Sequence, residues 1–341
     1  MSHGKTRFIS CILLIAILFS VNISANTMAT INGKEYSKAS SAINEAKSGD
    51  TVKFTSEELN GSLTVENKNI VLDGITIKNS DDSALYIKNS VVTIKNGSVS
   101  AMAVNNETGA IHDMYNIVKL ARELAPDASV HFDAVQAFCK FPLERFPGAD
   151  LISVSSHKIY GPKGMGALYI SERILKNGNI SPVIFGGGQE QGLRSGTENV
   201  IGIIGFGAAA KETGADIRAN AQYFTALRSY LCEKLADFPE NTVKINEPAV
   251  FAPHIVSITV SGIRSETMLH HLSSRGVYVS SGSACSSNTH HKSNALSSFG
   301  LSDSEADSTI RISFGLQNTR DDVDNFISAL SEGISRLAKK R

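Results

Sequence analysis

The sequence has no excess of charge of either sign and few cysteines. Its 33 lysine and arginine residues balance its 33 aspartate and glutamate residues over 341 positions. Because a neutral chain creates no net field that attracts nucleic acid or an anionic membrane, neither is an expected partner. The hydrophobic content of 42% is ordinary for a globular protein with a buried core. A small molecule is therefore the first partner to consider.

Only four cysteines are present, and they are far apart. Cys11 lies in an apolar stretch near the N-terminus, which leaves Cys139, Cys232 and Cys285 in the rest of the chain. This odd, scattered set argues against a disulfide framework and leaves at least one thiol with another role. Two adjacent histidines follow Cys285, but no second cysteine pair stands at ligand spacing, so no metal site is expected.

Hydrophobic runs are short as well. The apolar run at residues 8–21 follows basic residues and precedes small ones. It is shorter than the roughly 20 residues that a membrane-spanning helix needs. Residues 1–29, with the signal-like part at 5–25, are therefore interpreted as a secretory signal peptide, with an uncleaved anchor as the alternative.

Residues 30–101 consist of short alternating runs separated by Asn-Gly-type turns. "IKN" recurs at 77, 87 and 94, and paired apolar residues recur at Ile70 and at Val91. Short strands repeated at this spacing predict coils of a parallel β-helix. Two or three coils are near the minimum that buries a stable core.

From about residue 102 the pattern changes to strands that alternate with helices. Residues 151–155 and 166–170 read as strands, and 199–212 as an apolar helix. This alternation predicts an α/β domain with a mostly parallel sheet at 102–213. Residues 214–341 mix strands with helices near 265–274 and 320–338, which predicts a smaller α+β domain.

Lys158 and Asp133 are the first candidates for chemistry. Each follows a predicted strand, and the carboxyl ends of parallel strands are where α/β folds bind ligands. A lysine opposite a carboxylate suits pyridoxal phosphate, because the amine forms a Schiff base and the carboxylate keeps the pyridine nitrogen protonated. Taken singly, Lys158 is also compatible with a solvated surface lysine, and Asp133 with a helix N-cap.

Five motifs then occur in a fixed order. They are "VNNETG" (104–109), "HFDAVQAFCK" (131–140), "SSHKIYGPKGMGALY" (155–169), "GGGQEQGLRSGTEN" (186–199) and "SSGSACSS" (280–287). From residue 102 to the C-terminus the chain resembles a cysteine desulfurase of the NifS/IscS kind, within the class V aminotransferase superfamily. The resemblance implies a fold type I large domain at 102–213, here incomplete, and a small domain at 214–341 that carries the sulfur-accepting cysteine loop.

The resemblance also implies roles for residues around the cofactor, pyridoxal 5'-phosphate. Lys158 would form the Schiff base, Asp133 would pair with the pyridinium nitrogen, and Gln136 and Asn106 would contact the phenolic oxygen side. Ser155 and His157 would hold the phosphate, and Thr197 would reach the cofactor of a partner subunit in a homodimer.

The remaining roles concern the substrate, L-cysteine. Arg311 would bind its carboxylate through a two-pronged ion pair, with Asn106 beside it. Cys285, among small flexible residues, would take the sulfur as a persulfide, while Lys158, with His157, serves the proton transfers. The products would be alanine and sulfur passed to an acceptor or iron–sulfur scaffold protein. Arg311 could instead pair with a structural carboxylate, and Gly186 to Gly188 could be a simple turn.

The part of the family pattern that precedes "VNNETG" is missing. Residues 1–101 supply neither a glycine-led phosphate cup nor a histidine that stacks on the pyridine ring, because no histidine lies between His3 and His112. Weakened cofactor binding and reduced activity are therefore expected.

Two alternatives stay open. One is a selenocysteine lyase or aminotransferase of the same superfamily, and the other is an exported β-helix binding protein with an inactive C-terminal half. The family chemistry predicts a cytoplasmic location, and the segment at 5–25 predicts export.

Overall fold

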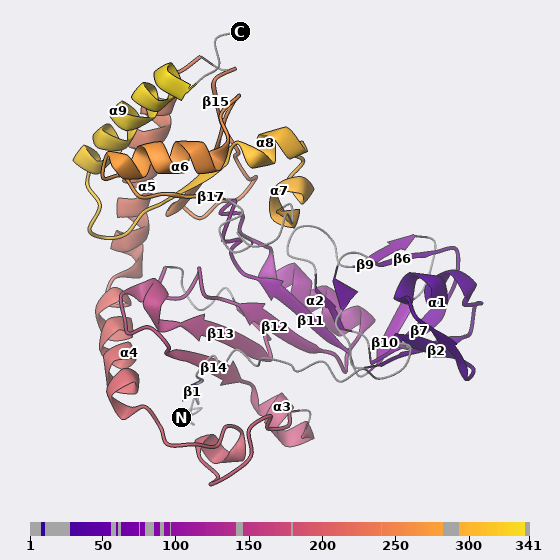
Figure 1. Ribbon diagram of the computed structural model, residues 1–341. Helices are drawn as coiled ribbons and strands as arrows, with labels where there is room; N and C mark the ends of the chain where they lie inside the picture. Colours follow the sequence, from indigo (N-terminus) through magenta and orange to yellow (C-terminus); the bar gives the residue numbers. More distant parts are fainter. Residues whose placement is uncertain are drawn as a thin grey trace. The chain divides into compact units, whose positions relative to one another are not determined.

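The computed structural model describes residues 8–10, 28–55, 59–60, 63–74, 76–78, 85–88, 92–95, 97–140, 146–178, 180–239, 241–281 and 293–337. The chain divides into two compact units. The first unit comprises Met1–Asn79, Ser83–Ala103 and Asp113–Ala215, and the second comprises Ser80–Asp82, Val104–His112 and Asp216–Arg341. Figure 1 shows the elements of both units.

The first unit is built on a seven-stranded sheet ordered β1-β14-β13-β12-β11-β8-β5 (Figure 1). The strands are β1 (Phe8–Ser10), β14 (Gly166–Ile170), β13 (Leu151–Ser155), β12 (Ser129–Asp133), β11 (Ser98–Met102), β8 (Thr76–Lys78) and β5 (Leu59–Asn60). The strands from β5 to β13 pair in parallel, as predicted, whereas β14 and β1 are antiparallel. β14 reverses because residues 156–165 are too few for a parallel crossover, which takes about a dozen residues or more.

Three α-helices and two short 3₁₀ turns accompany this sheet. They are α2 (Met114–Leu124), α3 (Glu172–Asn177), α4 (Val200–Thr213), η2 (Ser156–Ile159) and η3 (Glu190–Gly192). Side chains cap their amino ends: Asp113 Oδ1 accepts from the N–H of Asn116 at 3.1 Å, and Asn199 Oδ1 accepts from the N–H of Gly202 at 3.0 Å. Such caps satisfy N–H groups that the helix cannot pair, and they define where α2 and α4 begin.

The N-terminal part of the first unit contains two further sheets and one helix. The larger sheet has the order β10-β7-β4-β2-β3, with β10 (Val92–Lys95), β7 (Ile70–Asp73), β4 (Thr51–Phe54), β2 (Ala29–Ile31) and β3 (Lys34–Tyr36). The smaller sheet pairs β6 (Leu63–Glu66) with β9 (Leu85–Lys88), and the helix is α1 (Ala39–Glu45). Strands β4, β7 and β10 are parallel neighbours, and so are β6 and β9. That these residues form β-helix coils stays a prediction.

The same N-terminal residues also contribute to the main sheet. β8 pairs with β11 through Thr76 opposite Ser98, and β5 pairs with β8. The sequence pattern does not predict this, because strand pairing across a change of composition leaves no local signature. β11 is therefore not an edge strand, and its backbone groups are paired on both sides.

The second unit is an α+β layer, as predicted. Its antiparallel sheet has the order β15-β16-β18-β17, with β15 (Val243–Ile245), β16 (Ile255–Val260), β18 (Thr309–Ser313) and β17 (Ser280–Ser281). The helices are α5 (Ile217–Leu235), α6 (Ser265–Ser274), α7 (Asn294–Ser298), α8 (Asp303–Asp307) and α9 (Arg320–Leu337). One buried cluster joins α5, α6 and α9 to the sheet, with Leu231, Met268, Ile310 and Leu330 at its centre.

Within the described residues, no helix is both long and apolar enough to cross a bilayer. Of the signal-like segment at 5–25, only β1 is described, and the remainder lies outside the described residues. The signal-peptide interpretation therefore stays a prediction.

Candidate active site

Lys158 lies in η2, the short turn between β13 and β14, and is partly exposed. Tyr160 ends this turn in the left-handed conformation with φ 67°. Ser156 is fully buried, and a Cβ at Gly161 would lie 2.1 Å from its Oγ. Glycine at 161 is thus required by close packing. The turn that carries Lys158 is therefore closely packed at Ser156 and Gly161.

Helix α4 packs against this turn through glycines. A Cβ at Gly202 would lie 2.6 Å from Met165 Sδ, and one at Gly205 would lie 2.7 Å from Pro162 Cγ. At the other end of α4, the hydroxyl of Thr213 donates to the carbonyl of Ile159 at 3.4 Å. Small residues along α4 let the helix approach the backbone of residues 156–165, which explains its Gly-rich and Ala-rich sequence.

Asp133 ends β12, and its register partner on β13 is Ser153. Its Oδ1 accepts a hydrogen bond from the N–H of Val135 at 2.9 Å. No helix begins here, because residues 135–140 form turns, so the helix N-cap alternative for Asp133 is wrong. Oδ2 accepts no hydrogen bond from any described residue, which leaves one carboxylate oxygen for a ligand.

Gln136 and Lys140 lie in the turn after β12. Gln136 is 9% exposed, and Lys140 Nζ donates to its Oε1 at 3.4 Å. Burial, and then the positive charge of Lys158, lower the pKa of Lys140 to about 8. The two lysines follow adjacent strands, β12 and β13, and the charge of Lys158 reaches Lys140. Sequence reasoning missed Lys140, and its place four residues after Gln136 was the only available signal.

Ser155 and His157 form a pair beside Lys158. Ser155 Oγ and His157 Nδ1 are 2.8 Å apart, and the histidine is exposed. Burial of the ring, followed by the charges of Lys158 and Lys163, lowers the pKa of His157. A neutral imidazole that shares a hydrogen bond with a hydroxyl can still donate to an anion through its other nitrogen.

The chemistry of these side chains fits pyridoxal phosphate. Lys158 supplies an amine for the aldehyde, Asp133 an open carboxylate oxygen for the ring nitrogen, and Gln136 an amide for the phenolic oxygen. The hydrogen-bonded pair of Ser155 and His157 supplies a donor for the phosphate. In addition, the buried Ser156 Oγ has no hydrogen-bond partner among the described residues. The first unit thus brings together five of the predicted residues at the carboxyl ends of β12 and β13.

Arg311 and Asn106 meet in the second unit. Arg311 lies on β18, and its Nη1 donates to the backbone carbonyl of Asn106 at 2.6 Å. The "VNNETG" turn is held by Asn105, whose Oδ1 accepts from the N–H groups of Glu107 and Thr108, both at 2.9 Å. Gly109 follows with φ +76°, a conformation that favours glycine. These contacts aim the carbonyl of Asn106 at the guanidinium.

Cys285 lies outside the described residues, which stop at 281 and resume at 293. Both flanks are placed near the Arg311–Asn106 pair. Ser280 on β17 is the register partner of Arg311, and Ser293 Oγ donates to Glu107 Oε2 at 2.7 Å. The role of Cys285 stays a prediction. The described residue before the gap pairs with Arg311, and the one after it bonds to Glu107, which follows Asn106.

The other two thiols of the described residues are poor nucleophiles. Cys139 is buried, and burial raises its pKa to about 11. Cys232 is partly buried, and burial raises its pKa also. A raised pKa lowers the thiolate fraction near neutral pH.

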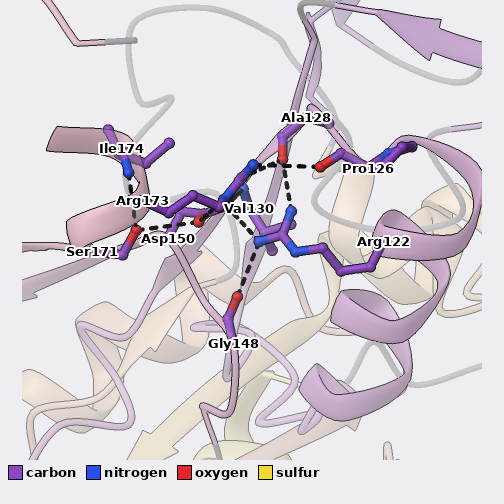
Figure 2. A network of polar contacts seen from close by, with 9 residues as sticks. All are labelled: Arg122, Pro126, Ala128, Val130, Gly148, Asp150, Ser171, Arg173 and Ile174. Carbon is purple, nitrogen blue, oxygen red and sulfur yellow. Dashed lines mark hydrogen bonds and ion pairs between the residues drawn. The ribbon is translucent and has the colours of Figure 1, made fainter. Parts of the chain in front are cut away.

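A buried ion network lies at the opposite ends of β12 and β13, where these strands begin (Figure 2). The Asp150 side chain is 3% exposed and pairs with Arg122 and with Arg173, each at 2.6 Å. It also accepts from the N–H of Val130 at 2.8 Å and from the hydroxyl of Ser171 at 3.2 Å. The network thereby ties β12 to α2 and α3 at the end where β12 and β13 begin. The sequence pattern did not reveal it.

An apolar surface lies around Thr197. Thr197 is exposed in the segment before α4, and the following residues Val200, Ile201 and Ile204 are 60%, 86% and 67% exposed. Phe185, on the same long connection, is 79% exposed. Large exposed apolar side chains thus stand on both sides of Thr197 in the sequence.

The chain is similar in sequence to a known protein family and to named members of it. The family pattern described as Aminotransferase class-V matches residues 37–326. The chain is 36% identical over 244 residues to cysteine desulfurase IscS of Dictyoglomus turgidum, covering 70% of this chain and 59% of the relative. It is 38% identical over 256 residues to cysteine desulfurase IscS of Clostridium botulinum strain Hall, covering 73% and 62%.

A solved structure agrees with these relatives. The X-ray structure of a NifS-like protein from Rickettsia africae has a TM-score of 0.62 and 34% identity, covering 70% of this chain and 62% of that chain. The chain spans about three fifths of the length of these relatives. The predicted α/β fold of type I is confirmed, and the chain belongs to the class-V aminotransferase family.

Proposed function

We propose that this chain acts as a pyridoxal-phosphate-dependent cysteine desulfurase, a sulfurtransferase that converts L-cysteine to L-alanine. The observation that carries the proposal is the grouping of Lys158, Asp133 and Gln136 at the carboxyl ends of adjacent parallel strands. Family membership and the named relatives support it. The sulfur would go to an acceptor or scaffold protein for iron–sulfur cluster or thio-cofactor assembly.

Each residue of the first unit would contact a different part of the cofactor. Lys158 would hold the cofactor's aldehyde carbon, Asp133 its ring nitrogen, Gln136 its phenolic oxygen, and Ser155 and His157 its phosphate. When bound, the cofactor supplies an electron sink for charge that develops at the substrate Cα. The Lys158 amine removes and returns the proton at that carbon.

Arg311, Asn106 and Cys285 would supply the substrate contacts. The Arg311 guanidinium binds the carboxylate of L-cysteine, and Asn106 lies beside it. The Cys285 thiolate forms a bond to the substrate sulfur while the carbon–sulfur bond breaks. The electron pair of that bond stays with the carbon, which takes a proton and becomes the methyl group of alanine. Cys285 is left as a persulfide.

The exposed apolar surface supports a homodimer. A second copy would remove Phe185, Val200, Ile201 and Ile204 from water and bring Thr197 to the partner's cofactor. Each fully buried apolar side chain of this size contributes about 1.5–3 kcal/mol. Ile201→Lys should therefore shift the protein to monomer in analytical ultracentrifugation, and an unchanged dimer would contradict this surface.

We place the activity in the cytoplasm, because a catalytic thiol needs a reducing compartment. Export through the segment at 5–25 is the alternative, and cell fractionation decides between the two. No observation favours the selenocysteine lyase, aminotransferase or inactive-passenger alternatives over the desulfurase.

The test uses the purified chain, added cofactor and L-cysteine. The visible absorption band of a lysine-bound cofactor should form, with alanine released in the presence of a thiol reductant. Lys158→Ala should abolish the band, whereas Lys163→Ala, in the same turn and exposed, should keep it. Cys285→Ser should keep the band and lose sulfur transfer. A folded wild-type chain without the band would overturn the proposed function.

A further inference from the structure

Lys140 is a partly buried lysine with an unusual environment. Lysines are rarely withdrawn from water unless a carboxylate pairs with them. No carboxylate of the described residues forms an ion pair with Lys140, and its hydrogen-bond partner is the amide oxygen of Gln136 at 3.4 Å. Two groups act on its charge: Lys158 lowers its pKa, and a Cys139 thiolate would raise it, but burial keeps that thiol protonated near neutral pH. A contribution to fold stability alone does not explain why a lysine is partly buried at this position.

Hydrogen-bond chemistry fixes how Gln136 faces Lys140. An ammonium group only donates, so the side-chain amide must present its oxygen to Lys140. The amide NH₂ then remains as the group of Gln136 that can serve a ligand, and no described residue accepts from it. A donor is what the electron-rich phenolic oxygen of the cofactor requires. Without Lys140, the Gln136 amide could rotate and present its oxygen to the phenolic oxygen of the cofactor, where no hydrogen bond can form.

We propose that Lys140 is a positioning residue of the cofactor site, which orients the Gln136 amide as a donor and places a positive charge beside Lys158. This inference rests on the proposed function of the same site. In this role Lys140 acts through Gln136 and Lys158 and needs no contact with substrate or cofactor.

The charge on Lys140 has a second effect. Burial and Lys158 lower the pKa of Lys140 to about 8, and the repulsion between the two ammonium groups is mutual. Charge on Lys140 therefore disfavours charge on Lys158. An uncharged amine is the form that attacks an aldehyde and that accepts a proton.

The experiment compares Lys140→Met with Lys140→Arg, with Lys163→Met as the matched control. Without cofactor, the rate at which trinitrobenzenesulfonate modifies Lys158 is followed by peptide mass spectrometry between pH 7 and 10. With cofactor, the pH midpoint of the visible band and the cofactor dissociation constant are measured. Circular dichroism and a urea titration check that each variant is folded.

In Lys140→Met, the loss of the charge that Lys140 carries below about pH 8 should raise the pH midpoint of Lys158 modification and that of the visible band. The loss of the oriented amide should weaken cofactor binding about tenfold, the effect of one hydrogen bond. Lys140→Arg should keep both properties near wild type, since it retains a donor and a charge. Lys163→Met should match wild type.

The inference fails if folded Lys140→Met has the wild-type pH midpoints and cofactor dissociation constant. If Lys140→Met does not fold, Lys140→Gln, which is polar but uncharged, is measured in its place. Failure of both variants to fold would show that Lys140 supports the fold, and would overturn the inference. Absence of the band in wild type would instead refute the proposed function, because the modification rates without cofactor are measured independently.

Discussion

Replacement of Asp150 by asparagine tests the network at the amino end of β12 and β13. Burial by itself raises the pKa of Asp150, but hydrogen bonds from Arg173, the N–H of Val130 and Arg122 outweigh it and lower the value from 3.8 to about 2. A depression of roughly two units corresponds to about 2.5 kcal/mol at 1.36 kcal/mol per unit. Because the side chains of Arg122 and Arg173 are 29% and 32% exposed, they regain some hydration in the variant. We therefore expect a loss of about 2 kcal/mol.

The pH dependence follows from the direction of this shift. The folded state favours the ionised carboxylate, so the contribution of Asp150 is complete above its unfolded pKa of 3.8. It is lost as the pH falls from about 4 to about 2, through the folded value. The stability difference between wild type and Asp150→Asn should thus be constant from pH 5 to 8 and shrink below pH 4.

The assay is urea unfolding followed by circular dichroism at several pH values. Glu123→Gln, an exposed carboxylate next to Arg122 on α2, is the matched control and should change the free energy of unfolding by less than about 0.5 kcal/mol. If Asp150→Asn also changes the free energy of unfolding by less than about 0.5 kcal/mol at pH 7, the network does not stabilise the amino ends of β12 and β13. A stability difference that persists to pH 2 would show that ionisation of Asp150 is not its source.

Two further predictions concern the cofactor and substrate. Gly161→Ala would place a methyl group 2.1 Å from Ser156 Oγ, so the turn must shift, and cofactor binding measured by the visible band should weaken at least about tenfold. Gly207→Ala, with open space around it on α4, should leave binding unchanged, and equal effects of the two variants would refute the packing argument. Arg311→Lys loses the forked guanidinium and should raise KM for L-cysteine about tenfold, with a smaller change in kcat. The surface variant Arg264→Lys is its control, and an unaltered KM for Arg311→Lys would exclude that carboxylate contact.

Local pattern in the sequence was enough to place several elements and the main chemical groups. The predicted strands at 151–155 and 166–170 and the helix at 265–274 coincide with β13, β14 and α6. Side-chain period and turn residues are properties of neighbouring positions, so they can be read without the fold. The same holds for Asp133 and Lys158, because Asp133 ends a strand and Lys158 lies in the turn after one.

The tertiary structure decided which residues meet across the chain. It brings Lys140 into the field of Lys158, and it sets Arg311 against Asn106 from an element far away in the sequence. It also adds β8, from the N-terminal segment, to the sheet beside β11. These contacts depend on strand order and on close packing of distant segments, which no local periodicity encodes. The sequence by itself thus determined which reactive groups are available, and the fold decided how they are paired.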